Sequence, residues 1–553
     1  MRKSVLAALL GVTMLAGPVG GAALAQEAPA ERAGDVSEAE AVRFLMQASF
    51  GPTEESIEDV RRLGYARWLS EQMRLPARST VERLGQMNDP LRPVMIDLFW
   101  ESALEADDQL RGRVAYALAN IVVVSLNTDE FYFNPEIFAT YYDILNREAL
   151  GNYRDLVRDV SLSPAMGLFL SHLGNRKADE TLGIAPDENY AREIMQLFTI
   201  GLVNLKPNGQ SLGTEAYTTE DVEGLAEVFT GLSWANRDFR WAWYGEDNIR
   251  LPMQSYADYH EPGAKSFLGR GVPAGTDAAA SVTRAVDHLI RHPNAAPFVS
   301  QQLIQHLVTS NPTPRYVRRV ARAFERGRFE SGGVRFGTGR RGDMQAVVAA
   351  ILLDEEARSQ RSRGRTIHGR LRDPILRFAH LTRAYRDDEG ATFSGTPETS
   401  GAMRYADAPY VLGQKVFSAP SVFGWYRPGY VPPGGWLGAR GGVAPEMELA
   451  TAANQAGFIR WMAITADSTV WNTDFFDLDV AGLEALAADE AALLDAVDLR
   501  LTAGTLQTST RNRILAALAT IPPASRDREG LPLNRVRLAL LMVATAPEFA
   551  VQR

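Results

Sequence analysis

Cysteine is absent from the 553 residues, which excludes disulfide bonds, thiolate metal ligands and a cysteine nucleophile. Lysine is scarce as well: it provides only five of the 58 basic residues, and arginine provides the rest. A phosphate loop ending in Gly-Lys-Ser or Gly-Lys-Thr and a His-Glu-x-x-His zinc motif are both missing. His288 and His292 have the spacing of two metal ligands, but no glutamate follows His288, and we predict no metal site.

The first 25 residues have the organisation of a secretory signal. Arg2 and Lys3 form a charged start, residues 5–16 are mostly apolar, and the segment ends in a small-x-small cleavage pattern at Ala25. We therefore expect a Sec-type signal that is cleaved near Ala25 and a secreted protein, either periplasmic or extracellular. No run of about 18 apolar residues follows, so we expect no transmembrane segment after cleavage.

The charge balance is acidic. The 58 basic and 67 acidic residues give a formal charge of −9, and loss of Arg2 and Lys3 with the signal would leave 56 against 67, or −11. An excess of negative charge disfavours nucleic acid and anionic membranes as general partners. We expect no nucleic-acid partner.

Helical periodicity dominates the chain from Ser37 onward, whereas strand-like alternation is limited to residues 238–256 and 265–269. The prediction is a mainly α protein, a large multi-helix body with a small β or irregular, aromatic-rich excursion around 233–275. After the signal we expect a flexible leader at 26–36 and a helical main domain at 37–465. Residues 466–553 are expected to form a C-terminal helical part of the same fold.

The segment from Pro186 to Phe198 is the first candidate for chemistry. On a helix, Asn189 and Glu193 lie four residues apart at the edge of an apolar face, and Arg192 lies opposite. A half-buried carboxylate there would have a raised pKa, which suits a general acid or base. The alternative is a structural carboxylate tied to a neighbouring arginine or to a helix end.

A second candidate lies downstream. Asp221 follows Thr218 with the spacing of a capping box, so a cap is its leading interpretation. Pro262-Gly263 fits the centre of a type II turn that would present His260 and Lys265 close together. Histidine is a natural proton carrier at neutral pH, and a lysine beside it would stabilise developing negative charge. The alternative is a structural turn whose histidine bonds to the backbone.

Aromatic residues are concentrated in two long irregular segments, 233–275 and 418–445. The first contains Trp234, Trp241, Trp243, Tyr244 and Tyr259. Such segments in a compact domain are usually functional, and rings of this kind hold sugars or anchor interfaces. The other interpretation is that the rings cover the core.

These stretches together resemble the bacterial DUF1800 family, a domain of unknown function. The matching segments include Arg43-Phe44-Leu45, Pro186 to Phe198, Tyr217 to Trp234, His260 to Gly269, His292 to Ser300 and the Ala419 to Phe423 loop. The resemblance implies an exported, mostly helical protein. It also implies a partner: a second exported protein with an alkaline-phosphatase-like fold.

Two hypotheses follow, and the sequence leaves open whether the protein is an enzyme. In the first, a hydrolase-like enzyme acts on an envelope or carbohydrate substrate. Glu193, His260, Lys265 and Asp221 would be catalytic, and Asn189, Arg192, Trp234 and Tyr259 would bind substrate. In the second, the protein is a non-enzymatic binding or assembly partner in the cell envelope. A metal-dependent oxidoreductase is a third possibility, and the residues identify no cofactor.

Overall fold

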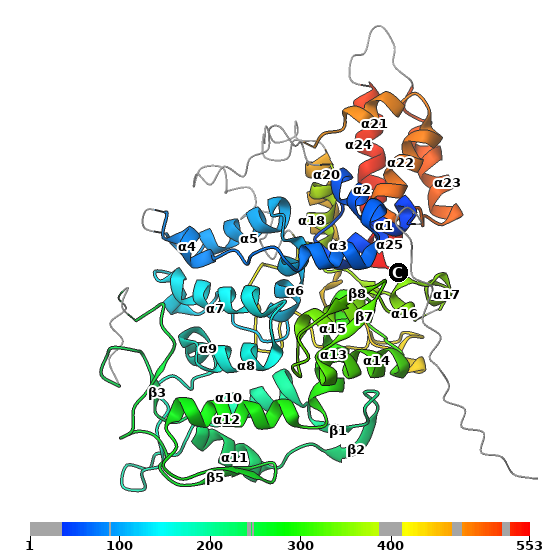
Figure 1. The fold of residues 1–553 in the computed structure, drawn as a ribbon. Helices are drawn as coiled ribbons and strands as arrows, with labels where there is room; N and C mark the ends of the chain where they lie inside the picture. The colour runs from blue at the N-terminus through cyan, green and yellow to red at the C-terminus, as the bar shows by residue number, and fades with distance from the viewer. Residues whose placement is uncertain are drawn as a thin grey trace, which may run out of the picture.

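The computed structural model describes residues 36–87, 90–239, 245, 248–365, 367–385, 412–466, 478–522 and 531–553. The expected signal, nearly all of the expected leader, and Trp241, Trp243 and Tyr244 lie outside the described residues. The described part is mainly helical, as predicted (Figure 1).

The N-terminal half is a series of helices joined by short loops. They are α1 (Glu38–Ala48), α2 (Glu54–Leu63), α3 (Tyr65–Gln72), α4 (Thr80–Leu84), α5 (Val94–Glu105), α6 (Gln109–Ala119), η1 (Asp129–Phe131), α7 (Pro135–Glu148), α8 (Tyr153–Ser161) and α9 (Pro164–Phe169). A capping box begins α1: Ser37 N–H donates to Glu40 Oε2 at 3.1 Å, and Ser37 Oγ accepts from Glu40 N–H at 3.3 Å.

The middle of the chain continues with α10 (Asn189–Glu193), the π-helix η2 (Ile194–Thr199), α11 (Thr219–Val228), α12 (Ala278–Arg291), α13 (Ala295–Leu307), α14 (Pro314–Arg326), α15 (Met344–Leu352), α16 (Glu355–Arg358), α17 (Gln360–Arg363) and α18 (Pro374–Ala384). Helix α14 shows how capping residues, proline and glycine set where a helix begins and ends. Thr313 accepts from Tyr316 N–H, Pro314 occupies the first turn, and Gly327 ends the helix with φ 60°.

The remaining described elements are η3 (Gly438–Arg440), η4 (Pro445–Leu449), α20 (Ala452–Ala466), α21 (Ala481–Leu486), α22 (Glu490–Thr502), α23 (Thr508–Leu518), α24 (Leu531–Ala544) and α25 (Pro547–Ala550). Helices α21–α24 form the group at the top of Figure 1 and return to the N-terminal helices through contacts between α1 and α22.

The strands of the described residues form five two-stranded antiparallel pairs. The pairs are β1 (Val203–Leu205) with β2 (Ser211–Glu215), β3 (Leu232–Ser233) with β4 (Gln254–Ser255), β5 (Lys265–Phe267) with β6 (Arg270–Val272), β7 (Phe329–Ser331) with β8 (Val334–Phe336), and β9 (Arg370–Leu371) with β10 (Val551–Gln552). The β excursion near 233–275 is therefore present. The strand expected at 238–256 is reduced to β4 in the described residues, and the remaining described positions are turns, bends or irregular backbone.

Arginine side chains are unusually deep in the core. Arg113 and Arg370 both donate to the backbone carbonyl of His306, and Arg372 donates to that of Phe549. Arg370 also contacts Glu446 Oε1 at 2.6 Å, and both side chains are about 2% exposed. These guanidinium groups link segments far apart in the sequence, which suits their five-donor geometry.

Candidate functional site

Glu193 lies at the junction where α10 widens into the π-helix η2. Its side chain is 8% exposed, and its Oε2 atom has no hydrogen-bond partner among the described residues. Burial raises the pKa of the Glu193 carboxyl, and the charge of Arg192 counters part of that effect. π-Helical turns occur frequently at functional sites. Glu193 thus has the environment of a carboxyl group that takes up a proton more readily than usual.

The two polar neighbours of Glu193 on this helix face outward. Arg192 is exposed and pairs with Glu188 at 3.0 Å, as its four-residue spacing predicts. Asn189 is also exposed, and its Nδ2 lies 3.5 Å from Ser171 Oγ. Among the described residues, neither side chain forms a hydrogen bond or an ion pair with the Glu193 carboxyl.

Asp221 is a cap that also fixes a hairpin. Its Oδ2 accepts from Thr218 N–H at 2.9 Å, which completes the expected capping box at the start of α11. Its Oδ1 accepts from Leu268 N–H at 2.6 Å in the β5–β6 turn, where Leu268 and Gly269 both have left-handed φ angles. The carboxylate therefore attaches the hairpin to α11 and stabilises a turn that a leucine adopts only with strain.

His260 is held on both sides of its ring. Nδ1 lies 2.7 Å from the Thr230 carbonyl, and Nε2 lies 3.2 Å from Ser281 Oγ. Donation from Nδ1–H to the carbonyl leaves Nε2 as the acceptor of the serine hydroxyl. Burial lowers the pKa of His260, so the neutral form is favoured. This arrangement matches the structural alternative, in which the histidine bonds to the backbone.

Lys265 lies near His260, as expected from their spacing, but through a different turn. The φ angle of Gly263 is outside the left-handed range, so a type II turn does not form, and the Glu261 carboxylate accepts from Gly263 N–H at 2.8 Å instead. Lys265 is fully buried and donates to the Gly263 carbonyl at 3.2 Å. Burial lowers the pKa of Lys265, and Glu261 and Glu227 oppose that shift.

The aromatic candidates pack against protein. Trp234 is 1% exposed, and its carbonyl accepts from the Tyr256 hydroxyl. Tyr259 stacks on Phe239 with ring centroids 3.9 Å apart and lies under the Arg176 guanidinium. Trp234 is therefore part of the core, and Tyr259 is part of a local aromatic stack.

The four residues predicted to be catalytic thus lie in two separate places. Asp221, His260 and Lys265 surround the β5–β6 hairpin, and each is bonded within that local framework. Glu193 lies on a different helix, and in the described part of the chain its carboxyl is not hydrogen-bonded to His260.

Two glycine motifs occur in settings that do not support their usual chemistry. Gly209 to Gly213 has the Gly-x-Ser-x-Gly pattern, but Ser211 begins the exposed strand β2 and is not at a strand-to-helix elbow. Gly337 to Gly342 has the Gly-x-Gly-x-x-Gly pattern between β8 and α15. There the Asp343 carboxylate already accepts from Gln345 and Ala346 N–H, so it occupies the helix end where a phosphate would bind.

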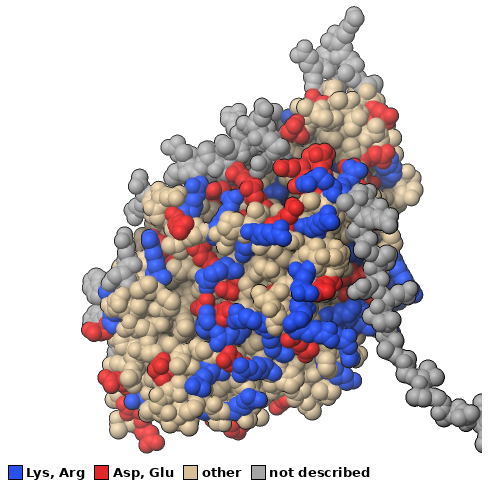
Figure 2. Space-filling view, in the orientation of Figure 1, with Lys and Arg blue, Asp and Glu red and all other residues tan. Residues whose placement is uncertain are grey.

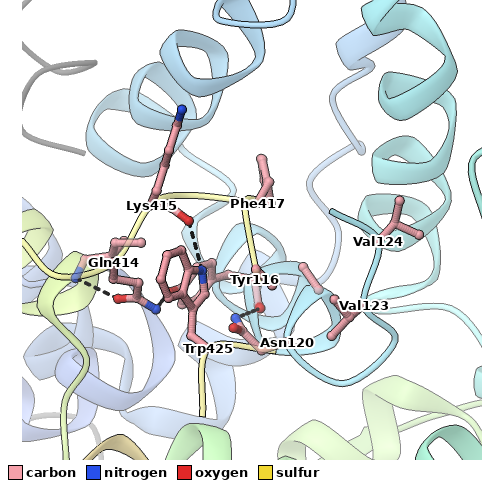
Figure 3. A pocket seen from close by; sticks show the side chains of 11 residues that line it. Tyr116, Asn120, Val123, Val124, Gln414, Lys415, Phe417 and Trp425 are labelled. Carbon is pink, nitrogen blue, oxygen red and sulfur yellow. Dashed lines mark hydrogen bonds between the residues drawn. The ribbon is translucent and has the colours of Figure 1, made fainter. Parts of the chain in front are cut away.

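The segment from residue 414 closes over a small cavity of about 20 Å³ (Figure 3). Trp425 Nε1–H donates to the Lys415 carbonyl at 3.0 Å, and Gln414 Nε2 lies 3.4 Å from the Tyr116 hydroxyl. A cavity of this size holds about one water molecule. This part of the second aromatic segment therefore covers the core.

A larger groove lies between the N-terminal helices and the α21–α22 pair. It encloses about 650 Å³ and is lined by apolar and acidic side chains. The acidic ones are Glu54, Glu55, Asp59, Glu105, Asp107 and Asp479; the apolar ones include Leu45, Trp68, Leu104, Leu483 and Leu486; Arg383, Tyr385 and Arg500 also line it. Tyr385 is 8% exposed, and its hydroxyl has no hydrogen-bond partner in the described residues. The sequence did not indicate this groove, because its walls are separated by hundreds of residues.

Neither a metal site nor a membrane span emerges from the described residues. No group of three histidine or acidic side chains there is placed to hold a metal ion. None of the helices described is both long enough and apolar enough to cross a membrane.

Comparison with known families gives one result that covers nearly the whole chain. The family model described as a protein of unknown function, DUF1800, matches residues 43–551. The chain belongs to the DUF1800 family, as its motifs indicated. Neither curated proteins nor solved structures give a significant match.

Proposed function

We propose that this protein is an exported, non-enzymatic binding or assembly protein that holds a basic segment of a partner protein in the groove between α1–α3 and α21–α22. The observation that carries the proposal is the composition of that groove, which is lined by apolar side chains and by six carboxylates. Grooves with an apolar base accept amphipathic helices, and the rim charges select the partner.

The electrostatics of the groove favour a cationic occupant. Arg500 is engaged by Glu54, and Arg383 donates to the carbonyls of Leu104 and Gly51 at 2.6 and 2.9 Å. Glu55 and Asp107 have no ion pair within the described residues and are exposed. The groove thus keeps a negative potential that its two arginines do not neutralise.

The Tyr385 hydroxyl beside the groove is buried and has no hydrogen-bond partner in the described residues. Burial raises the pKa of Tyr385, so the hydroxyl keeps its proton and remains a donor. We propose that the occupant belongs to a second exported protein, the kind of partner that the family resemblance implies; an alkaline-phosphatase-like fold for that partner is part of the same expectation.

The groove can be tested with an amphipathic lysine-leucine peptide as the probe. The Glu55→Lys/Asp107→Lys variant should weaken peptide binding about tenfold or more, measured by calorimetry at low and physiological salt. The matched control is Glu223→Lys/Asp258→Lys, which makes the same charge change at exposed positions elsewhere. Equal losses in both variants would show attraction by overall charge and overturn the groove assignment.

A photo-crosslinker at Gly482 connects this test to the native partner. In intact cells it should yield one discrete adduct that the groove variant loses and the control variant keeps. An adduct unaffected by both variants would also contradict the proposal.

Export has its own test. The mature protein should be recovered from the periplasm or the medium with Gln26 at its N-terminus. Recovery of the uncleaved chain from the cytoplasm alone would contradict export.

Glu193 favours a second candidate, a hydrolase-like enzyme acting on an envelope or carbohydrate substrate. The single supporting observation is the buried Oε2 atom that lacks a partner. If purified protein hydrolyses envelope glycans or phosphoesters, Glu193→Gln should remove most of that activity, whereas Glu188→Gln on the exposed side should retain it. Undiminished turnover in Glu193→Gln would exclude this role.

A further inference from the structure

A row of arginines runs along the exposed side of α14. Arg315, Arg318, Arg322 and Arg326 are separated by three, four and four residues, so they lie within one face of the helix. All four are exposed, and none has a hydrogen bond or ion pair with another described residue. At 1.5 Å per residue the row is about 16 Å long.

The opposite face of α14 fixes this row in place. Tyr316, Val317, Val320 and Phe324 are at most 2% exposed and pack into the core, and α14 contacts both α13 and α15. The Tyr316 hydroxyl donates to the Ile351 carbonyl at 2.6 Å. The backbone that carries the arginines is therefore held on a rigid platform, which reduces the ordering needed on binding.

Acidic residues flank the row on both sides. Arg319 lies at one edge and is paired with Asp354 at 2.7 Å and Glu355 at 3.2 Å. Glu325 lies at the other edge of the row. Because each residue of a helix is rotated by about 100°, Glu325 points in nearly the same direction as Arg318. Figure 2 shows lysine and arginine side chains gathered over the region that α13–α15 occupy in Figure 1, although the whole chain is acidic.

We propose that this row binds a linear anionic glycan that carries carboxylate groups along its length. Guanidinium groups pair with carboxylates in a bidentate manner. A single file of cations bounded by acids fits a thin chain better than a broad anionic surface. The row itself contains no aromatic side chain on which a nucleic-acid base would stack. The proposal does not depend on the groove.

The test uses polygalacturonate as the probe. The variant with Arg315, Arg318, Arg322 and Arg326 all replaced by Gln should bind it about tenfold or more weakly, because each arginine contributes separately to the attraction. The matched control replaces four other exposed arginines by Gln and so has the same net charge: Arg61, Arg67, Arg74 and Arg513. The control should change affinity less than about twofold. Circular dichroism verifies that both variants are folded.

Three outcomes would overturn the proposal. Wild-type affinity in the α14 variant would show that the row is not the site, and an equal loss in the control would show attraction by overall charge. Tighter binding to single-stranded DNA of equal charge, or to vesicles containing anionic phospholipid, would assign the row to another class of partner.

Discussion

The buried arginines around Arg370 and the exposed row on α14 use the same side chain in opposite ways. Arg370 is 2% exposed and is bonded to a carbonyl and to Glu446, whereas the α14 arginines face solvent without partners among the described residues. The first group connects distant segments and the second leaves its donors available. Arginine content alone therefore does not distinguish a structural role from a binding role.

Buried polar side chains also connect the C-terminal residues of this cysteine-free chain to helices α1 and α13. Arg43 in α1 donates to the backbone carbonyl of Arg553, and Gln552 Nε2 donates to that of Leu307 at 2.8 Å. Strand β10 pairs with β9, which contains Arg370 and is followed by Arg372. Guanidinium and amide donors thus make connections between remote segments, which disulfides make in many secreted proteins.

The largest effect should come from breaking the buried ion pair. Arg370→Met leaves the Glu446 carboxylate buried without its cation, and we expect a loss of about 3–5 kcal/mol in the free energy of unfolding at pH 7. Urea denaturation measures it. The double variant Arg370→Met/Glu446→Leu should recover a large part of the loss. A single variant as stable as the wild type would break the comparison.

A smaller loss in the free energy of unfolding should follow when the pH is lowered. Burial lowers the pKa of His306 to about 3, and the neighbouring charges of Arg370 and Arg113 add to the shift. In the unfolded chain the imidazole titrates near 6.5, so the unfolded state takes up a proton first as the pH falls. The stability that a neutral His306 supplies is complete above pH 6.5 and is lost as the pH falls from there toward 3.

The His306→Gln variant isolates this contribution. Between pH 7 and pH 5 the wild type should lose about 2 kcal/mol more than the variant, measured by denaturation at both pH values. Other buried histidines with lowered pKa values, such as His172 and His368, remain in the variant and provide its residual slope. Identical pH dependence in the two proteins would show that His306 does not titrate in this way.

Much of the fold was predictable because its signals are local. Apolar periodicity identified the helices, and the helix starts expected at Ser37 and Thr218 are confirmed by the structure. The row of arginines on α14 could also have been predicted, because they recur at three- and four-residue intervals. The net charge of −9 gives no indication of it. Local patterns fail where the backbone departs from regular geometry, as in the π-helix after Glu193.

The site was less predictable because it depends on tertiary packing. The spacing of His260 and Lys265 indicated their proximity. The hydrogen-bond partners of the imidazole, Thr230 and Ser281, lie elsewhere in the sequence and could not be predicted. The groove requires α1–α3 and α21–α22, which no periodicity connects. The orphaned hydroxyl of Tyr385 likewise follows from what surrounds it.

The smallest change in the free energy of unfolding is expected for a substitution in the exposed row of arginines on α14. Arg322→Gln removes a charge that has no partner among the described residues, and the helix retains a residue of similar propensity. The free energy of unfolding should change by less than about 0.5 kcal/mol, because solvent-exposed substitutions away from caps and ion pairs rarely exceed that. Urea denaturation beside Arg370→Met measures both in one experiment. A loss of stability comparable to that of Arg370→Met would mean that the row is structural too, and the division between the two groups of arginines would no longer hold.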